Sequence, residues 1–408
     1  MNTRLLPIAP EKLLEVAEKH GTPVWVTDEK TIKGKCAEMI DAFSDLNIKI
    51  FYAMKANFNP AYIKIIKDAG IYGIDAVSPN EVRLALEIGY KPEQIIFTPS
   101  NPTDEEMKFV GEKNILQNLG SLSELERFGK MFSGSDVSVR LSPNIGVGEF
   151  DKITTGQNES KFGIVLDDFA EVQNICKKYK LSLVGIHCHL GSGFYTATEF
   201  TEAFELLLGI SNQFSDIKFI DMGGGFGVQY DPDKPEINLQ DFAAALKEKL
   251  ENGNNKNLEI RIEPGKFLIS QSTVLLTTVT TRKEKEIIFL GTDSGFHHLI
   301  RPAMYGAYHH ILNISNPESE GGIEHVQVAG NVCETCDIFN DGIDMSVSKE
   351  GDVLAISVAG GYGSTMSSNY NLREIASEVL VKENGEIVLT KKRQSYEQMM
   401  ENFVTKNS

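Results

Sequence analysis

In Phe51-Tyr52-Ala53-Met54-Lys55-Ala56-Asn57 an apolar run ends in Lys-Ala-Asn, a pattern typical of a β-strand that delivers one lysine into an enclosed site. Burial disfavours the ammonium form of a lysine and lowers its pKa, and the neutral amine can condense with an aldehyde as a Schiff base. Taken alone, such a stretch more often places the lysine head in water. The rest of the chain decides between the two interpretations.

Eight runs rich in apolar and β-branched residues follow one another, separated by amphipathic stretches. The runs are Ile48–Met54, Ile74–Ser78, Ile95–Ser100, Ile115–Leu119, Val137–Leu141, Leu183–His189, Ile217–Met222 and Leu258–Glu263. Helical spacing recurs between them, for example at Asn80–Ile88, Ser121–Phe128, Phe169–Lys178, Thr198–Ser211 and Leu239–Leu250. This alternation predicts an α/β fold, a parallel (β/α)8 TIM-type barrel, because a doubly wound sheet usually has fewer strands.

Polar or glycine-rich residues stand at or just after the predicted strand ends. They are Lys55, Ser78, Asn118, Pro143, His189, Gly223 to Gly225, and Glu263. The carboxyl ends of the strands in such a barrel meet on one face, where barrel enzymes have their active sites. The sequence therefore predicts that these residues surround one site.

After residue 272 the pattern changes to β-rich runs with turn signals. These runs are Thr273–Thr281, Glu286–Leu290, Glu324–Ala329, Val353–Val358 and Ile387–Leu389. We expect three parts: an N-terminal segment 1–28 that packs with the β domain, a barrel over 29–272, and a C-terminal, mainly antiparallel β domain over 273–408.

The composition of the chain limits the classes of partner that it can bind. The 57 Asp and Glu residues outnumber 40 Lys and Arg, and the net charge of −17 opposes binding to nucleic acid or anionic membranes. No stretch resembles a signal peptide or a membrane span, so we expect a cytoplasmic protein with a small-molecule ligand. The five cysteines do not describe a disulfide framework, and Cys333-x-x-Cys336 lacks a second pair or nearby histidine for zinc.

Three segments carry chemistry besides Lys55. Gly223-Gly224-Gly225 would let backbone N–H groups approach a phosphate, or would simply make a tight turn. A Gly-x-Gly-x-x-Gly dinucleotide fingerprint is excluded, because position 228 is Val228 and not glycine.

His187 and His189 lie on the same side of their predicted strand, where one of them could stack on an aromatic ring. A metal site and a packed core histidine are the alternatives, and we expect no metal. Glu263-Pro264-Gly265 places a carboxylate that needs a cationic partner, such as a protonated pyridine nitrogen.

Taken together, these segments resemble the fold-type III pyridoxal-phosphate decarboxylases, the class with an alanine-racemase-like barrel. The resemblance spans residues 22–382, and the number, order and spacing of its motifs make it specific. It rests on Tyr52–Asn57, Ser160–Gly163, His187–Ser192, Gly223–Gly225, Glu263–Gly265, Arg301–Tyr305, Cys333–Asp337 and Ser368–Asn371.

The resemblance implies a cofactor, pyridoxal 5'-phosphate, and a role for each matching residue. Lys55 carries the cofactor as a Schiff base, His189 stacks on its ring, and Glu263 pairs with the pyridine nitrogen. The remaining cofactor contacts come from Ser192, Gly223, Gly224, Gly225, Gly265, Lys266 and Tyr370. Cys333 returns the proton after decarboxylation, reaching the active site of the neighbouring subunit in a homodimer.

The resemblance also implies a substrate, meso-2,6-diaminopimelate, decarboxylated at its D-centre to L-lysine and carbon dioxide. The residues implied to bind it are Arg301, Tyr305, Glu334, Lys266 and Tyr370. One departure is Lys266, where the family has arginine after Glu-Pro-Gly; lysine keeps the charge but loses the bidentate fork. A second is Asn371–Ile375, where a Pro- and Arg-rich continuation is expected.

Three alternatives remain open. A related decarboxylase of the same fold would act on ornithine, arginine, lysine or a carboxylated polyamine. An amino-acid racemase would release no gas, and the Cys333-Glu334 segment speaks against it. A non-catalytic binding or regulatory homologue is the third alternative, and the joint presence of Lys55, His189, Glu263 and Cys333 argues against it.

Overall fold

The computed structural model describes residues 4–145, 160–214, 216–252 and 258–404, which divide into two compact units. The barrel unit comprises Lys33–Val228 and Glu236–Leu268. The β unit comprises Met1–Ile32, Gln229–Pro235 and Ile269–Ser408.

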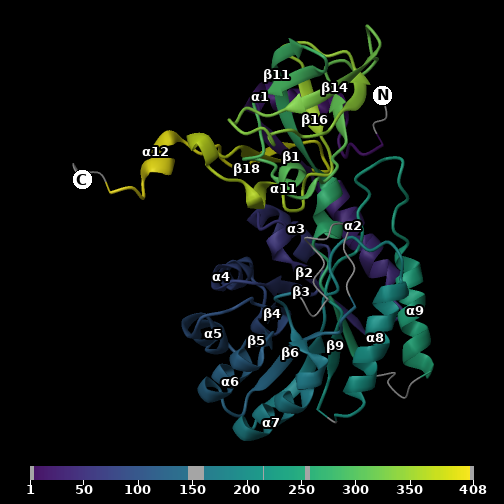
Figure 1. The fold of residues 1–408 in the computed structure, drawn as a ribbon, viewed down its shortest axis with the longest axis vertical. Coiled ribbons are helices and arrows are strands. Elements are labelled where there is room, and N and C mark those ends of the chain that lie inside the picture. The colour runs from purple at the N-terminus through teal and green to yellow at the C-terminus, as the bar shows by residue number, and fades with distance from the viewer. Residues whose placement is uncertain (1–3, 146–159, 215, 253–257, 405–408) are drawn as a thin grey trace. The chain divides into compact units, whose positions relative to one another are not determined.

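Within the described residues, eight parallel strands close into a barrel, which confirms the predicted fold class (Figure 1). Each strand pairs with the next in chain order, and the last returns to the first, with Ile260 opposite Ile48. The strands are β2 Ile48–Ala53, β3 Gly73–Ala76, β4 Ile95–Phe97, β5 Leu116–Leu119, β6 Asp136–Ser142, β8 Ser182–His187, β9 Phe219–Asp221 and β10 Glu259–Ile262; the short β7 Ile164–Val165 pairs only with β6. Since all eight run the same way, their carboxyl ends share one face.

Helices that alternate with these strands begin at residues suited to capping. Ser78 accepts a hydrogen bond from the N–H of Glu81 at the start of α4, and Thr103 and Glu106 form a capping box at α5. The helices are α2 Glu29–Ala42, α3 Pro60–Asp68, α4 Pro79–Ile88, α5 Asp104–Gly111, α6 Leu122–Met131, α7 Phe169–Tyr179, α8 Thr198–Ser211, α9 Leu239–Asn252 and α10 Lys266–Ile269. In the part of the chain that is described, no helix is both long enough and apolar enough to cross a membrane.

Four phenylalanines form an aromatic core at one side of the barrel unit. The rings of Phe194, Phe200, Phe226 and Phe242 all contact one another, with centroids 5.5 to 5.8 Å apart. Phe226 directly follows the three consecutive glycines, so this packing anchors the loop after β9.

The β unit is built on a mixed, mainly antiparallel sheet in the order β15-β14-β12-β11-β1-β17-β18, with β16 paired to β11 and β13 to β16. Trp25 on β1 packs into one hydrophobic cluster, whereas Val24 and Val26 pack into the other, so both faces of this strand are buried. The elements are α1 Pro10–His20, β1 Val24–Asp28, β11 Thr273–Glu284, β12 Ile288–Thr292, α11 Arg301–Tyr305, β13 Ile311–Asn313, β14 Ile323–Ala329, β15 Ile343–Ser346, β16 Val353–Ile356, β17 Ser377–Val381, β18 Ile387–Lys391 and α12 Tyr396–Met400.

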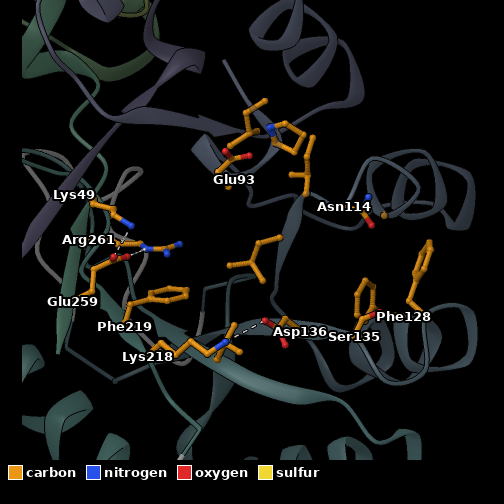
Figure 2. Close-up of a pocket in the computed structure, with 17 residues that line it drawn as sticks. Lys49, Glu93, Asn114, Phe128, Ser135, Asp136, Lys218, Phe219, Glu259 and Arg261 are labelled. Carbon is orange, nitrogen blue, oxygen red and sulfur yellow. Dashed lines mark hydrogen bonds and ion pairs between the residues drawn. The ribbon is translucent and has the colours of Figure 1, made fainter. Parts of the chain in front are cut away.

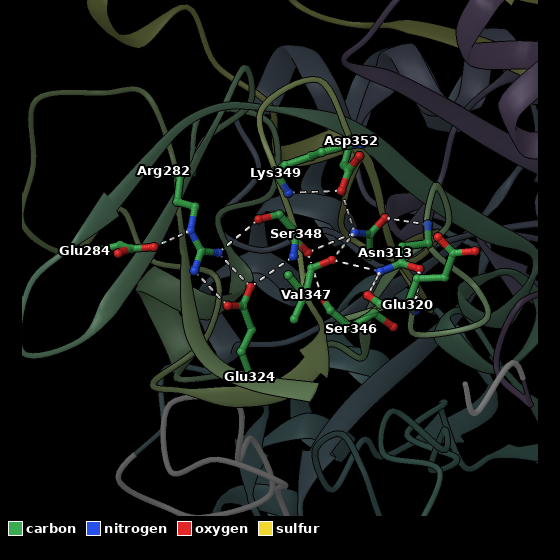
Figure 3. Close-up of polar contacts among 11 residues, drawn as sticks. Arg282, Glu284, Asn313, Glu320, Glu324, Ser346, Val347, Ser348, Lys349 and Asp352 are labelled. Carbon is green, nitrogen blue, oxygen red and sulfur yellow. Dashed lines mark hydrogen bonds and ion pairs between the residues drawn. The ribbon is translucent and has the colours of Figure 1, made fainter. Parts of the chain in front are cut away.

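A polar network joins strands of this sheet to the loop after β15 (Figure 3). Arg282 donates two hydrogen bonds to the Glu324 carboxylate, at 2.7 and 2.8 Å, and a third to the carbonyl of Ser348. Asn313 donates to the Ser348 hydroxyl and to Asp352, each at 2.9 Å. Since Arg282 and Glu324 lie on β11 and β14, their pair bridges the intervening strand β12.

Candidate active site

Lys55 stands directly after β2, in the 3-10 turn η1 Met54–Ala56. Tyr52 donates its hydroxyl to the carbonyl of Asn57 at 2.9 Å, a bond that spans the turn. The Lys55 Nζ atom lies 2.7 Å from Oδ2 of Asp75, a fully buried residue on the neighbouring strand β3. An ion pair therefore holds the lysine at the carboxyl end of the barrel, with 37% of its side chain exposed.

Both predicted histidines lie at this same end of the barrel. His187 ends β8, with Nε2 3.2 Å from Oε2 of Glu263, and the Nδ1 atom of His189 accepts a hydrogen bond from the N–H of Gly224 at 3.2 Å. Burial, followed by the positive charge of Arg140, holds the pKa of each ring well below its usual value. Both imidazoles are therefore neutral, and His189 offers an uncharged ring.

Glu263, at the end of β10, belongs to a buried cluster with His187 and Asp221. One donor atom from each of the three residues lies within 4.8 Å of the others. Burial and the charge of Glu263 raise the pKa of Asp221 well above its usual value; burial also raises the pKa of Glu263, and Lys55 opposes that rise. The sequence showed no carboxylate next to the histidines, whereas the fold supplies two; the expectation of no metal stays a prediction.

The three consecutive glycines form a tight loop after β9. Gly223 and Gly225 have φ angles of 64° and 111°, and a Cβ on Gly224 would lie 2.2 Å from the carbonyl oxygen of Glu263. The N–H groups of Gly223 and Gly224 already donate to side chains of the site. Among bonds between described residues the Gly225 N–H has no acceptor, so it is the one of the three best placed for a phosphate.

The segment after β10 packs against the Lys55 turn. The N–H of Ala53 donates to the carbonyl of Pro264 at 3.2 Å, and a Cβ on Gly265 would lie 3.1 Å from that of Ala56. Lys266 begins α10 and is 5% exposed. The fold therefore brings Lys266 close to the turn that carries Lys55. Ser192 is half-buried between β8 and α8.

Sequence inspection did not identify three charged residues at this site: Asp75, Asp221 and Arg140. Arg140 lies on β6, with its guanidinium 4.6 Å from the ring centre of Phe162; burial lowers its pKa, and the charge of Glu263 opposes that effect. The signal available was a charged residue inside a predicted apolar strand, as Arg140 is within Val137–Leu141.

The remaining predicted residues belong to the β unit and fall into two groups. Arg301 and Tyr305 share α11; Arg301 is buried, donates from Nε to His309 Nε2 at 3.3 Å, and lies 5.0 Å from the ring centre of Tyr230. Neither of these two contacts of Arg301 involves a carboxylate.

The second group surrounds Cys333, whose thiol is exposed. The N–H of Cys333 donates to Oδ1 of Asn371 at 3.0 Å, and Nδ2 of Asn371 donates back to the sulfur at 3.2 Å. The Tyr370 hydroxyl donates to Glu334, which raises the pKa of Tyr370 to about 12. Cys336 is also free and exposed.

A cavity of about 540 Å³ opens at the opposite, amino-terminal end of the barrel strands (Figure 2). Most of its charged groups are paired with one another: Glu259 binds Lys49 at 2.6 Å and Arg261 at 2.7 Å, and Lys218 lies 3.4 Å from Asp136. No predicted site residue lines it, so the carboxyl end of the barrel remains the candidate active site.

Comparisons with known proteins point to one family. Residues 29–270 match the family model described as pyridoxal-dependent decarboxylase, pyridoxal binding domain. Diaminopimelate decarboxylase of Methanothermobacter thermautotrophicus is 37% identical over 95% of this chain and 92% of its own length. The crystal structure of diaminopimelate decarboxylase from Helicobacter pylori complexed with L-lysine superposes with a TM-score of 0.89, at 30% identity, covering 95% of this chain and 98% of that one. The crystal structure of diaminopimelate decarboxylase from M. jannaschii in co-complex with L-lysine superposes with a TM-score of 0.87, at 30% identity, covering 97% of this chain and 95% of that one.

Proposed function

Because the chain belongs to the pyridoxal-dependent decarboxylases, and within them to the diaminopimelate decarboxylases, we propose that it removes the carboxyl group at the D-centre of meso-2,6-diaminopimelate. The products are L-lysine and carbon dioxide. The observation that carries the proposal is the grouping of Lys55, His189 and Glu263 at one end of the barrel.

The residues at this end suit pyridoxal phosphate. Lys55 would supply the amine for its aldehyde, and the neutral His189 ring would pack on its face. Among the described residues Glu263 Oε1 has no hydrogen-bond partner, so the Glu263 carboxylate has lone pairs left for a pyridine N–H. The Gly225 N–H and Ser192 would bind the phosphate, and Gly223, Gly224, Gly265 and Lys266 would shape the site. Tyr370, which belongs to the β unit, is proposed as a further cofactor contact. When bound, the cofactor accepts the electron pair left by departing carbon dioxide.

Recognition of the substrate is assigned to residues that bind the distal amino-acid end of diaminopimelate. Arg301 suits the distal carboxylate and Glu334 the distal ammonium, with Tyr305 and Tyr370 beside them. Lys266 contributes a single positive charge in place of the family's forked arginine. Ornithine, which lacks a distal carboxylate, would leave Arg301 without its anion.

We further propose that the enzyme is a homodimer in which Cys333 of one subunit returns a proton to the substrate carbon in the other. Asn371 supports this role because it fixes Cys333 at two points, accepting from its backbone N–H and donating to its sulfur. The five free cysteines suit a reducing compartment, so we propose a cytoplasmic location.

Carbon dioxide release tests the substrate. Purified protein supplied with pyridoxal phosphate should release gas from meso-diaminopimelate, and at least about a hundredfold more slowly from ornithine, arginine and lysine, because those substrates leave buried charges unpaired. Faster release from ornithine or arginine would assign a related decarboxylase instead. Interconversion of enantiomers without gas would assign a racemase.

A further inference from the structure

The buried cluster of His187, Asp221 and Glu263 contains two carboxyl groups whose hydrogen bonds are incomplete. All three side chains are at most 4% exposed, and they come from the ends of three consecutive strands, β8, β9 and β10. Glu263 Oε2 is 3.2 Å from His187 Nε2, and Asp221 Oδ1 accepts the N–H of Gly223 at 2.9 Å. Asp221 Oδ2 and Glu263 Oε1 are buried and have no donor among the described residues.

One donor atom of each carboxyl group lies within 4.8 Å of one of the other, and both side chains are at most 4% exposed. Two adjacent carboxylates this deeply buried cannot both stay ionised without a proton or a cation between them. The bond from Gly223 marks Oδ1 of Asp221 as an acceptor, which leaves Oδ2 as the atom that carries a proton. That proton would satisfy both remaining oxygens with one hydrogen bond.

Resting on the proposed function, we propose that Asp221 and His187 are positioning residues for Glu263: Asp221, as a carboxylic acid, donates to Oε1, and His187 donates to Oε2. These two hydrogen bonds would keep the Glu263 carboxyl ionised and fix its orientation, so that its remaining lone pairs face the pyridine nitrogen. Two donors stabilise the carboxylate form of Glu263, and that charge in turn favours the protonated pyridine.

The surrounding charges agree with this arrangement. Burial and the charge of Glu263 raise the pKa of Asp221, as expected for a group that keeps its proton. Lys55 and then Arg140 favour the ionised form of Glu263 and oppose the rise in its pKa. Burial, more than any charge, keeps His187 neutral, so it donates from Nε2 without adding a positive charge.

Two substitutions of Asp221 test whether Glu263 requires a hydrogen-bond donor at this position. In Asp221→Asn the amide oxygen still accepts from Gly223 and the amide N–H₂ still donates to Glu263, so affinity for pyridoxal phosphate should stay within about threefold of wild type. Asp221→Ala removes the donor, and cofactor affinity should fall roughly ten- to hundredfold. His187→Gln and His187→Phe form the matching pair at the other oxygen.

The decisive readout is the ¹⁵N chemical shift of ring-labelled pyridoxal phosphate bound to each variant without substrate. The shift should remain that of a protonated pyridine nitrogen in wild type and Asp221→Asn, and move toward the unprotonated value in Asp221→Ala. Thermal melting of the cofactor-free proteins shows whether each variant is folded; if Asp221→Ala does not fold, His187→Gln against His187→Phe gives the same comparison.

Three results would overturn the inference. They are an Asp221→Ala or His187→Phe protein with unchanged shift and affinity, an Asp221→Asn protein as impaired as Asp221→Ala, or one equivalent of divalent metal in purified wild type that is lost in Asp221→Ala. Wild-type protein that binds no pyridoxal phosphate, or releases no carbon dioxide from any substrate, would instead overturn the proposed function and this inference with it.

Discussion

At the scale of single residues, Lys55 has a matched control on the strand that leads to it. Lys49 lies on β2 and, like Lys55, is ion-paired, to Glu259 at 2.6 Å, but it stands at the opposite end of the barrel. Borohydride reduction of cofactor-loaded protein should attach pyridoxyl phosphate to Lys55, as peptide mass spectrometry would detect. Lys55→Ala should lose both the reduced adduct and the visible absorbance of the Schiff base measured before reduction, whereas Lys49→Ala should keep both. An adduct retained in Lys55→Ala would remove this lysine from the proposal.

Residues that sit in recognisable motifs could be predicted, and residues that act by long-range contact could not. Lys55, His189 and Glu263 each stand in a short pattern at a strand end. Asp75 and Asp221 stand inside apolar strand runs, where a carboxylate carries no local signal of its partner. Asp75 meets Lys55 only because β2 and β3 pair in a register that no local pattern specifies.

At the scale of elements, the bridge between β11 and β14 predicts a pH-dependent stability. The hydrogen bond from Arg282 lowers the pKa of Glu324 below its usual value of 4.5. A carboxyl with a depressed folded pKa contributes stability that is fully present above the unfolded value and is lost as pH falls through the folded value. Glu324→Gln should therefore cost roughly 1 to 2 kcal/mol in urea unfolding at pH 7, and less below about pH 4.5.

The control for this prediction is Glu386→Gln, which breaks the exposed pair of Glu386 with Lys382 at 2.8 Å. Solvent screens that pair, so its loss should leave the unfolding midpoint unchanged. A Glu324→Gln penalty that stayed constant from pH 7 to pH 3 would mean that Arg282 does not stabilise the ionised carboxylate.

The strands of the barrel were easier to predict than the strand pairs of the β unit. The eight barrel strands can be recognised by their alternation with helices, because each repeat buries an apolar strand under an amphipathic helix. β17, Ser377–Val381, was not identified, although it lies beside β1 in the sheet of the β unit. Its pairing with β1 joins residues more than 300 positions apart, which no local pattern encodes.

At the scale of the whole molecule, the proposed catalytic groups divide between the two units, with Lys55 in the barrel unit and Cys333 in the β unit. Cys333→Ala should lower turnover about 10²- to 10⁴-fold, the usual value of general acid help, while cofactor still binds. Cys336→Ser is the matched control, since this neighbouring thiol is equally free and exposed but has no proposed role.

Mixed dimers test whether Cys333 acts across the subunit boundary. Lys55→Ala and Cys333→Ala proteins, each nearly inactive alone, are mixed and allowed to exchange subunits. If each site takes Lys55 from one subunit and Cys333 from the other, half of the dimers contain one intact site, and activity should recover to roughly a quarter of wild type. If both residues of a site come from the same subunit, every site keeps one defect and activity stays at the level of the separate variants. Size-exclusion chromatography with light scattering should show a dimer in both cases; a monomer with full activity would exclude the shared site altogether.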